Sequence, residues 1–400
     1  MIDVNILTKD VNPLSRFYSN FKVTERILLT GHSHQAWPDA AYEGIREAWK
    51  DAALLVDDKW EKAFHKSDRV RQGYAELLDG KAHNIALATN THELFIKFLS
   101  ALDLKNRRKV ITSDSEFYTV RRQLDRLDKE FLEVVNVASE PYDTLSERMA
   151  QLVDDKTAAV VISKVFYNNS KIIENLSLLD STCEKFGARL MIDTYHTLNA
   201  IPFSIIEENL PNSFVLGGGY KYCQLGEGNC FMLIPDGVEF RPALTGWFSE
   251  FGMITAPKVQ GQVNYGPSHW QFAGSTYDPI SHYRASSVLD FFRDMQYSPV
   301  KLREISLHQL KYLASEFDKA GMPSEIIDRK RDIPLEKFGG FIVFYTKRAA
   351  RITNELRQRN IFVDFRGENL RFGPAPYLSN RQLADSIVAL KEIVNNMGKK

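Results

Sequence analysis

Cysteine is scarce in this sequence: its 400 residues include three, Cys183, Cys223 and Cys230. Three scattered cysteines cannot build a disulfide framework or a cysteine-rich zinc site, so neither class of protein is expected. The histidines His32 and His34 lie close together near the N-terminus, but no third or fourth ligand stands beside them in the sequence. We therefore predict no metal site.

The sequence also lacks an excess of either charge and any long apolar run. Its 51 basic and 51 acidic residues give a net charge of zero, so no basic surface is predicted that would bind nucleic acid or an anionic membrane. No apolar run approaches the roughly 20 residues of a membrane span, and the N-terminus lacks the basic and apolar regions of a signal peptide. We expect a cytoplasmic protein.

What the sequence does have is apolar material for a large core, at 44% of residues, arranged in alternating strands and helices. The continuous apolar run 158–163 is typical of a strand buried on both faces. Residues 39–79 predict helix, with Trp49 and Trp60 in the core, and helices alternate with short strands after about residue 300. We predict an α/β fold with a mostly parallel sheet and helices on both faces, plus a smaller C-terminal α+β domain. The expected units are an arm (1–50) joining the small domain, a large domain (51–285) and the small domain itself (286–400).

One stretch points to chemistry, the segment 215–233. An apolar pair runs into three glycines, the triplet Tyr220-Lys221-Tyr222 follows, and a Gly-x-Gly and a second apolar run complete it. A lysine in a crowded, partly apolar place tends to lose its proton, and a neutral amine can form a Schiff base with a carbonyl. By itself the pattern also suits a strand–turn–strand with a surface lysine.

A second stretch lies upstream, where an apolar run ends in Asp193 and His196 follows three residues later. In parallel α/β sheets, ligands bind outside the carboxyl ends of the strands, and a carboxylate there can pair with a cationic ring nitrogen. An aspartate at a strand end is also a common helix cap. Together, however, Asp193, His196 and Lys221 supply the lysine and the acid that pyridoxal phosphate (PLP) requires.

These residues carry a resemblance to a known family. The motifs are Asp193-Thr194-Tyr195-His196, Tyr220-Lys221-Tyr222 with Gly226-Glu227-Gly228, Gly246-Trp247-Phe248, and the run from Arg371 to Pro376. The chain resembles fold-type-I PLP enzymes of the class V aminotransferase group. Within that group it is most similar to kynureninases, because a tyrosine precedes the lysine. The resemblance covers roughly residues 25–395.

The resemblance implies roles for particular residues. Lys221 would be the catalytic Schiff-base lysine, Asp193 would protonate the cofactor ring nitrogen with support from His196, and Arg371 would bind the substrate carboxylate. Trp247 and Thr276 match positions that reach the phosphate of a neighbouring subunit, which implies a homodimer with shared sites. The remaining implied cofactor contacts are Asn90, Thr91, Phe117, Ser163 and Tyr220.

Two departures from kynureninases concern the substrate. Starting at the aromatic residue that stacks on the ring, kynureninases typically read Phe-Pro-Ser/Thr-Asp, whereas this chain has Phe117-Tyr118-Thr119-Val120 and so lacks the proline and the aspartate. Kynureninases also carry a Tyr-Thr-Gly with a proton-transferring tyrosine. In this chain either Tyr167 takes that role or Asn168 has replaced it.

The predicted function is a PLP-dependent hydrolase of the kynureninase type, cleaving the Cβ–Cγ bond of kynurenine or a related aryl-oxo amino acid. The alternative is another PLP reaction on an amino acid: transamination, β-elimination or desulfuration. Desulfuration is the weakest of these, because the family's mobile-loop cysteine has no counterpart between Phe231 and Lys400. A third reading is a non-enzymatic binding or regulatory relative, against which the joint presence of Lys221, Asp193 and Arg371 argues.

Overall fold

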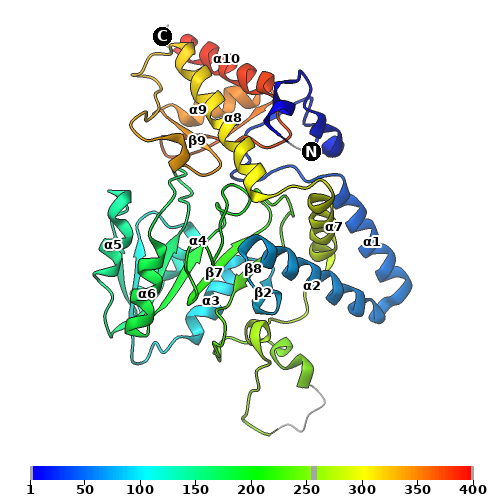
Figure 1. Ribbon diagram of the computed structural model, residues 1–400, viewed down its shortest axis with the longest axis vertical. Helices are drawn as coiled ribbons and strands as arrows, with labels where there is room; N and C mark the ends of the chain where they lie inside the picture. The colour runs from blue at the N-terminus through cyan, green and yellow to red at the C-terminus, as the bar shows by residue number, and fades with distance from the viewer. Residues whose placement is uncertain (1–2, 254–258, 398–400) are drawn as a thin grey trace.

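The computed structural model describes residues 3–253 and 259–397, which form two lobes around separate cores (Figure 1). The lower lobe holds a seven-stranded sheet in the order β2-β8-β7-β6-β5-β3-β4. Strands β7, β6, β5, β3 and β4 are mutually parallel, and β8 runs antiparallel to both of its neighbours. The strands are β2 (Ile85–Ala88), β3 (Lys109–Ser113), β4 (Glu133–Val137), β5 (Thr157–Ser163), β6 (Arg189–Asp193), β7 (Ser213–Gly218) and β8 (Cys230–Leu233).

Helices cover both faces of this sheet, so the predicted α/β architecture is confirmed. One face packs against α3 (Thr91–Ala101) and α4 (Tyr118–Asp128). The other packs against α2 (Lys59–Leu78), α5 (Leu145–Ala150), α6 (Leu176–Phe186) and α7 (Ile280–Asp294), and α1 (Ala40–Leu55) packs on α7. The short 3₁₀ segments of this lobe are η3 (Val56–Asp58), η4 (Ala82–Asn84), η5 (Tyr142–Thr144), η6 (Trp247–Met253) and η7 (Ser268–Phe272).

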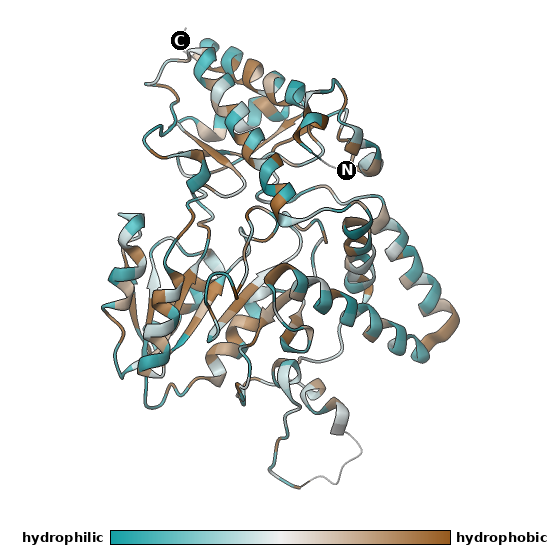
Figure 2. Ribbon diagram, viewed as in Figure 1, coloured by the Kyte–Doolittle hydropathy of each residue, from teal (hydrophilic) through white to brown (hydrophobic). Residues whose placement is uncertain are grey.

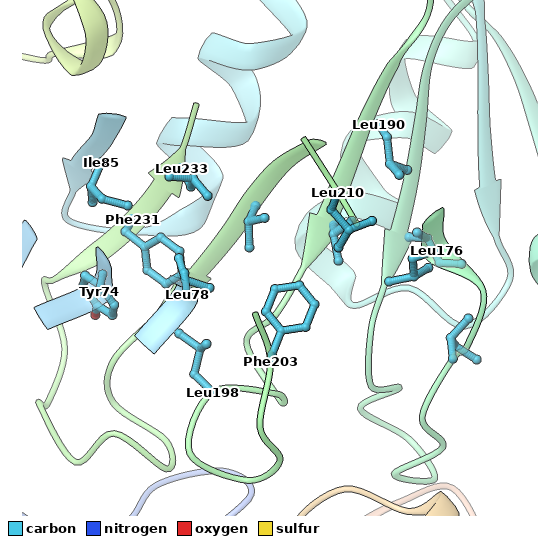
Figure 3. Close-up of a cluster of buried hydrophobic side chains, with 14 of the residues drawn as sticks. Tyr74, Leu78, Ile85, Leu176, Leu190, Leu198, Phe203, Leu210, Phe231 and Leu233 are labelled. Carbon is cyan, nitrogen blue, oxygen red and sulfur yellow. The ribbon is translucent and has the colours of Figure 1, made fainter. Parts of the chain in front are cut away.

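The continuous apolar strands are explained by burial on both faces. Along β6, Leu190 and Ile192 enter the core under α6, whereas Met191 between them enters the core under α3. Successive side chains of a strand point to opposite faces, so a strand covered on both sides needs apolar residues at every position. Figure 2 shows these strands as mostly hydrophobic. Figure 3 shows Leu190, Leu210, Phe231 and Leu233 packed together in the core on the α6 side of the sheet.

The upper lobe combines the two ends of the chain. Side chains of the N-terminal arm, including Leu7, Tyr18 and Leu29, are buried in the same core as the C-terminal helices. This core contains η1 (Val4–Thr8), η2 (Pro13–Phe21), α8 (Pro299–Ala320), α9 (Ala349–Arg357) and α10 (Asn380–Met397). Its strands are β9 (Ile342–Tyr345), β11 (Asp364–Arg366) and β12 (Asn369–Phe372), with the separate pair β1 (Ile27–Leu28) and β10 (Ile361–Phe362), and η8 (Leu335–Lys337) completes the lobe.

The expected unit boundaries at residues 50 and 285 fall inside helices α1 and α7. Membership of the two cores changes instead between Ala36 and Ala41, and again between Leu302 and Ile305. The chain therefore crosses between the lobes near residues 37–40 and 303–304.

One local prediction is wrong. Trp49 was expected in the core, but its side chain is 76% exposed on α1, because α1 turns another face toward α7. The predicted helical stretch 39–79 is confirmed: it consists of α1, the 3₁₀ turn η3 and α2, and it ends at Asp79 in the left-handed conformation (φ 52°). Within the described residues, no helix is both long and apolar enough to cross a membrane.

Candidate active site

The carboxyl ends of five parallel strands, β2, β3, β5, β6 and β7, surround a cavity of about 540 Å³. Such an edge is where parallel α/β sheets place their ligands. Eight of the eleven residues predicted for the site line this cavity: Asn90, Thr91, Phe117, Ser163, Asp193, His196, Tyr220 and Lys221.

Lys221 lies in the loop after β7 and is 6% exposed. Its Nζ is 2.6 Å from His196 Nε2 and lies 4.6 Å from the centre of the Tyr195 ring. Burial, opposed by the charge of Asp193 and assisted by that of Arg371, lowers the pKa of Lys221 to about 7. A large fraction of this amine is therefore neutral at physiological pH, as a nucleophilic lysine requires.

The glycines before Lys221 serve close packing. A Cβ on Gly219 would lie 2.4 Å from Asn229 Oδ1, and one on Gly218 would lie 2.5 Å from the Tyr195 hydroxyl. Neither residue has a positive φ, so what the loop requires here is the absence of a side chain rather than an unusual backbone angle. The glycines thus let the loop descend from β7 into the sheet edge and carry Lys221 to the cavity.

Asp193 ends β6 and is 9% exposed, with its Oδ1 accepting a hydrogen bond of 2.8 Å from the Tyr195 backbone N–H. Burial raises the pKa of Asp193, while that hydrogen bond and the Lys221 charge act in the opposite direction. His196 is 6% exposed, and among the described residues its buried Nδ1 has no hydrogen-bond partner. Burial, followed by the charge of Lys221, holds the pKa of His196 well below its ordinary value, so the imidazole is neutral.

At the other end of the cavity, helix α3 begins. Asn90 caps it, its Oδ1 accepting a 2.9 Å hydrogen bond from the Glu93 N–H, and Thr91 is the first helical residue. A helix N-terminus carries partial positive charge and suits a phosphate group. Phe117, which follows β3, also lines the cavity, and its ring centre is 5.5 Å from Lys221 Nζ.

Of the two candidates for the tyrosine role, Tyr167 lines the cavity, and its ring meets Phe117 edge-on at 5.2 Å. Asn168 does not line it, and its buried Oδ1 has no hydrogen-bond partner in the part of the chain that the structure describes. Val120, at the position where kynureninases have aspartate, is buried in the core beneath α4. The structure therefore has no carboxylate at position 120 to act on the cavity.

Arg371 lies behind the cavity wall and does not line it. Its side chain is 3% exposed and forms a two-point ion pair with Asp364, with Nε–Oδ1 and Nη2–Oδ2 distances of 2.7 and 2.6 Å. Nε2 of the buried His32 also lies 2.7 Å from Asp364 Oδ1. Burial alone would raise the pKa of Asp364, but His32 and Arg371 hold it well below its usual range.

Trp247 and Thr276 also lie outside the Lys221 cavity. Trp247 is 50% exposed on η6, and Thr276 lines a second cavity of about 660 Å³. The two cavities share four lining residues: Thr89, Asn90, His92 and Gly228. The second cavity therefore adjoins the side of the first at which α3 begins.

Several residues of the site were not predicted. Tyr195 lines the cavity within the Asp193–His196 motif, and Glu116 sits behind its wall immediately before Phe117. Asp364 pairs with Arg371 across the β11–β12 hairpin, where the two residues are in direct register. A turn at Arg366-Gly367-Glu368 between two apolar runs was the available signal for this register, whereas nothing in the sequence pattern marked Glu116.

The donor set fits the PLP that the resemblance implies. A buried amine with a lowered pKa, a buried carboxylate, a flanking aromatic ring and a helix N-terminus surround one cavity. These would serve the aldehyde, the ring nitrogen, the ring face and the phosphate of the cofactor, respectively. The neutral His196, whose Nδ1 has no hydrogen-bond partner within residues 3–253 and 259–397, stands among them.

No protein-family model matches the chain. Among curated proteins, it is 24% identical to the kynureninase of Shouchella clausii, over 96% of this chain and 92% of that protein. It is 23% identical to the kynureninase of Geobacillus thermodenitrificans over the same shares, and 18% identical to an uncharacterized aminotransferase, YcbU, of Bacillus subtilis over 92% and 94%.

Solved structures share the fold. One is a mutant of C-DES, with glycine covalently linked to its PLP cofactor, at a TM-score of 0.82 and 12% identity over 95% of this chain and 99% of that one. Another is a cysteine desulfurase from Thermococcus onnurineus, at a TM-score of 0.76 and 17% identity over 99% of each chain. At such identities these structures establish the fold alone. The chain therefore has the fold of type I PLP enzymes, and over nearly its whole length it resembles the kynureninases of the class V aminotransferase group.

Proposed function

We propose that this protein is a PLP-dependent enzyme that acts on an amino acid, and that its reaction is hydrolytic Cβ–Cγ cleavage of kynurenine or a related aryl-oxo amino acid. The observation that carries the proposal is the meeting of Lys221, Asp193 and His196 in one buried cavity at the sheet edge. The full-length resemblance to two kynureninases supports the choice of reaction.

The cofactor supplies an aldehyde that condenses with amines and a ring that withdraws electrons from the carbon bearing the amine. Lys221 Nζ would hold the cofactor covalently at rest and, once freed by the substrate amine, would take the proton from the substrate Cα. Asp193 would keep a proton on the ring nitrogen. Neutral His196, 2.6 Å from Lys221 Nζ, would orient that amine and accept its hydrogen bond.

Substrate binding would involve an exchange at Arg371. In this structure Asp364 occupies two of the guanidinium N–H groups, and the Tyr167 carbonyl accepts from a third nitrogen, Nη1. Arginine binds carboxylates in this same two-point geometry. We infer that the substrate carboxylate either replaces Asp364 or takes the free edge of the guanidinium, and that Tyr167 moves with it because its carbonyl is tied to the same group.

The aromatic lining favours an aryl side chain. Phe117, Tyr118 and Tyr167 contact one another at ring-centre distances of 5.2 to 5.6 Å, and two of them line the cavity. Aromatic rings gain about 0.5–1.5 kcal/mol from such edge and stacked contacts beyond the area they bury. After water adds to the γ-carbonyl of kynurenine, breaking the Cβ–Cγ bond would yield anthranilate and alanine.

The test is to load the purified protein with PLP, add L-kynurenine or 3-hydroxykynurenine without any 2-oxo acid, and quantify aryl product and alanine by chromatography. Equal amounts of the two products are expected. Absence of both, with a cofactor spectrum that still responds to other amino acids, would refute the hydrolase assignment.

A second candidate, transamination or β-elimination on another amino acid, is favoured by one observation. The aspartate of kynureninases is replaced by the buried Val120, so one family carboxylate is missing here. A product that forms only when a 2-oxo acid is supplied would identify a transaminase. Desulfuration stays the weakest option, because the family's mobile-loop cysteine would stand after Phe231 and the sequence has no cysteine after Cys230.

A further inference from the structure

Glu116 is a buried carboxyl group that the proposed reaction does not use. It is 1% exposed, and it lies between β3 and α4 at the carboxyl edge of the sheet. Within the described part of the chain, no lysine, arginine or histidine forms an ion pair with it. An unpaired buried carboxyl group is costly to keep ionised, so its position requires an explanation.

Two serine hydroxyls hold this group in place. Ser113 Oγ donates to Glu116 Oε1 at 2.6 Å, and Ser163 Oγ donates to Oε2 at 2.5 Å. Ser163 also lines the Lys221 cavity, so Glu116 stands one hydroxyl group away from it.

Ser163 also stands beside Asp193 in the sheet. Ser163 and Asp193 end adjacent parallel strands and are partners in register, so Glu116, Ser163 and Asp193 form a line across β3, β5 and β6. Burial raises the pKa of Glu116 to about 7, the two serine hydrogen bonds act against that rise, and the negative charge of Asp193 adds to it. The charged group that acts on Asp193 from the other side is Lys221.

The direction of the Ser163 hydroxyl depends on this proton. When Glu116 is ionised it can only accept, so Ser163 must turn its proton toward Glu116 and away from the cavity. When Glu116 is protonated it donates one bond itself, which frees a serine proton to turn toward Asp193 or a bound ligand.

We propose that Glu116 is a positioning residue of this site, which acts through the Ser163 hydroxyl and through its charge to set the proton balance at Asp193 and at the cofactor bound against it. The proposal rests on the proposed PLP function. In effect, Glu116 supplies a second carboxyl group behind the cavity, in a chain that has valine at position 120.

The test compares Glu116→Gln with Asp180→Asn. Asp180 is a matched control because it is also a buried carboxyl group that accepts a serine hydroxyl bond of 2.5 Å, but it lies on α6 outside the cavity. We would load each protein with PLP and record the absorbance of the bound cofactor against pH. Removing a nearby negative charge makes the cofactor easier to deprotonate, so Glu116→Gln should lower the midpoint by about one pH unit. Asp180→Asn should leave the midpoint unchanged.

Ser163→Ala tests the route. If Glu116 acts through this hydroxyl, Ser163→Ala should also lower the midpoint, and the double variant should shift it by less than the sum of the single shifts. Additive shifts would overturn the hydroxyl route. If Glu116→Gln does not fold, Ser163→Ala is sufficient for the test. An unchanged pH midpoint of the cofactor absorbance in Ser163→Ala would then refute the proposal.

A cofactor-free measurement separates this proposal from the proposed function. A carboxyl group whose pKa is raised on folding contributes stability at low pH that is lost as pH rises through the folded value. Glu116→Gln lacks this loss, so its thermal stability relative to wild type should rise as the pH increases from about 4.5 to about 7 and then stay constant. A stability difference that does not change with pH would overturn the proposal. Failure of wild type to bind PLP would refute the function and the proposal together. Binding with an unchanged midpoint in Glu116→Gln would refute the proposal alone.

Discussion

The pKa of Lys221 predicts how the protein should take up its cofactor. Attack on the aldehyde requires a neutral amine, and burial lowers the pKa of this amine to about 7. The rate of covalent attachment to cofactor-free protein should therefore rise through about pH 7 and level off by about pH 8. Stopped-flow absorbance measures this rate. A rate that still climbs steeply above pH 9, as for an ordinary exposed lysine, would contradict the assignment.

Asp193 should be required for the catalytic reaction but not for covalent attachment of the cofactor to Lys221. Asp193→Asn removes the charge that would hold a proton on the ring nitrogen, but it leaves Lys221 and His196 in place. We expect the variant to carry the cofactor on Lys221 and to lose at least about 100-fold in turnover. Mass spectrometry of the trapped adduct and a turnover assay read the two effects separately. Full turnover in Asp193→Asn would remove Asp193 from the mechanism.

At the scale of elements, two glycines are required for different reasons: Gly219 because its surroundings are crowded, and Gly367 because its backbone has a positive φ. Gly219→Ala would place a Cβ 2.4 Å from Asn229 Oδ1 in the loop that carries Lys221, whereas Gly367→Ala meets nothing within 4 Å but requires a φ of 57° in the β11–β12 turn. Gly219→Ala should cost about 1–3 kcal/mol and impair cofactor attachment. Gly367→Ala should cost about 1 kcal/mol and leave attachment intact. Chemical denaturation and the trapped adduct measure both effects, and normal attachment in Gly219→Ala would show that the loop can relax.

The elements that the sequence predicted are those with a strong local signal. The apolar strands, the helices after residue 280 and the residues at strand ends could be placed, because burial on both faces and strand-end chemistry leave a pattern along the chain. The exposure of Trp49 could not be predicted, because it depends on which face of α1 packs against α7. The Asp364–Arg371 pair and the Glu116–Ser163 contact were missed because each joins side chains from different strands or loops, and a local sequence pattern does not show such contacts.

At the scale of the whole molecule, the unused residues Trp247 and Thr276 predict sharing between subunits. Neither lines the Lys221 cavity of its own chain, although Thr276 lines the cavity beside it. We propose that they complete the site of a second copy in a homodimer. Light scattering should then give twice the mass of one chain.

Complementation tests the sharing directly. Lys221→Ala and the double variant Trp247→Ala/Thr276→Ala should each be inactive alone, because every site in either protein is incomplete. After unfolding and refolding together, half of the dimers are mixed and hold one complete site each, so about one quarter of wild-type activity should return. A mixture that stays inactive would show that these residues act within their own chain or only support the fold.

The assignment of Lys221 as the residue that binds PLP is tested by locating the covalent adduct on the chain. We would incubate the cofactor-free protein with PLP, reduce it with borohydride and map the labelled peptide by mass spectrometry in wild type, Lys221→Ala and Lys109→Ala. Lys109 is a control because it is also buried, at 9% exposure, but it begins β3 outside the cavity. One label is expected, on Lys221; it should be retained in Lys109→Ala and absent from Lys221→Ala. A label on another lysine of the wild type, or equal labelling of Lys221→Ala, would contradict the assignment.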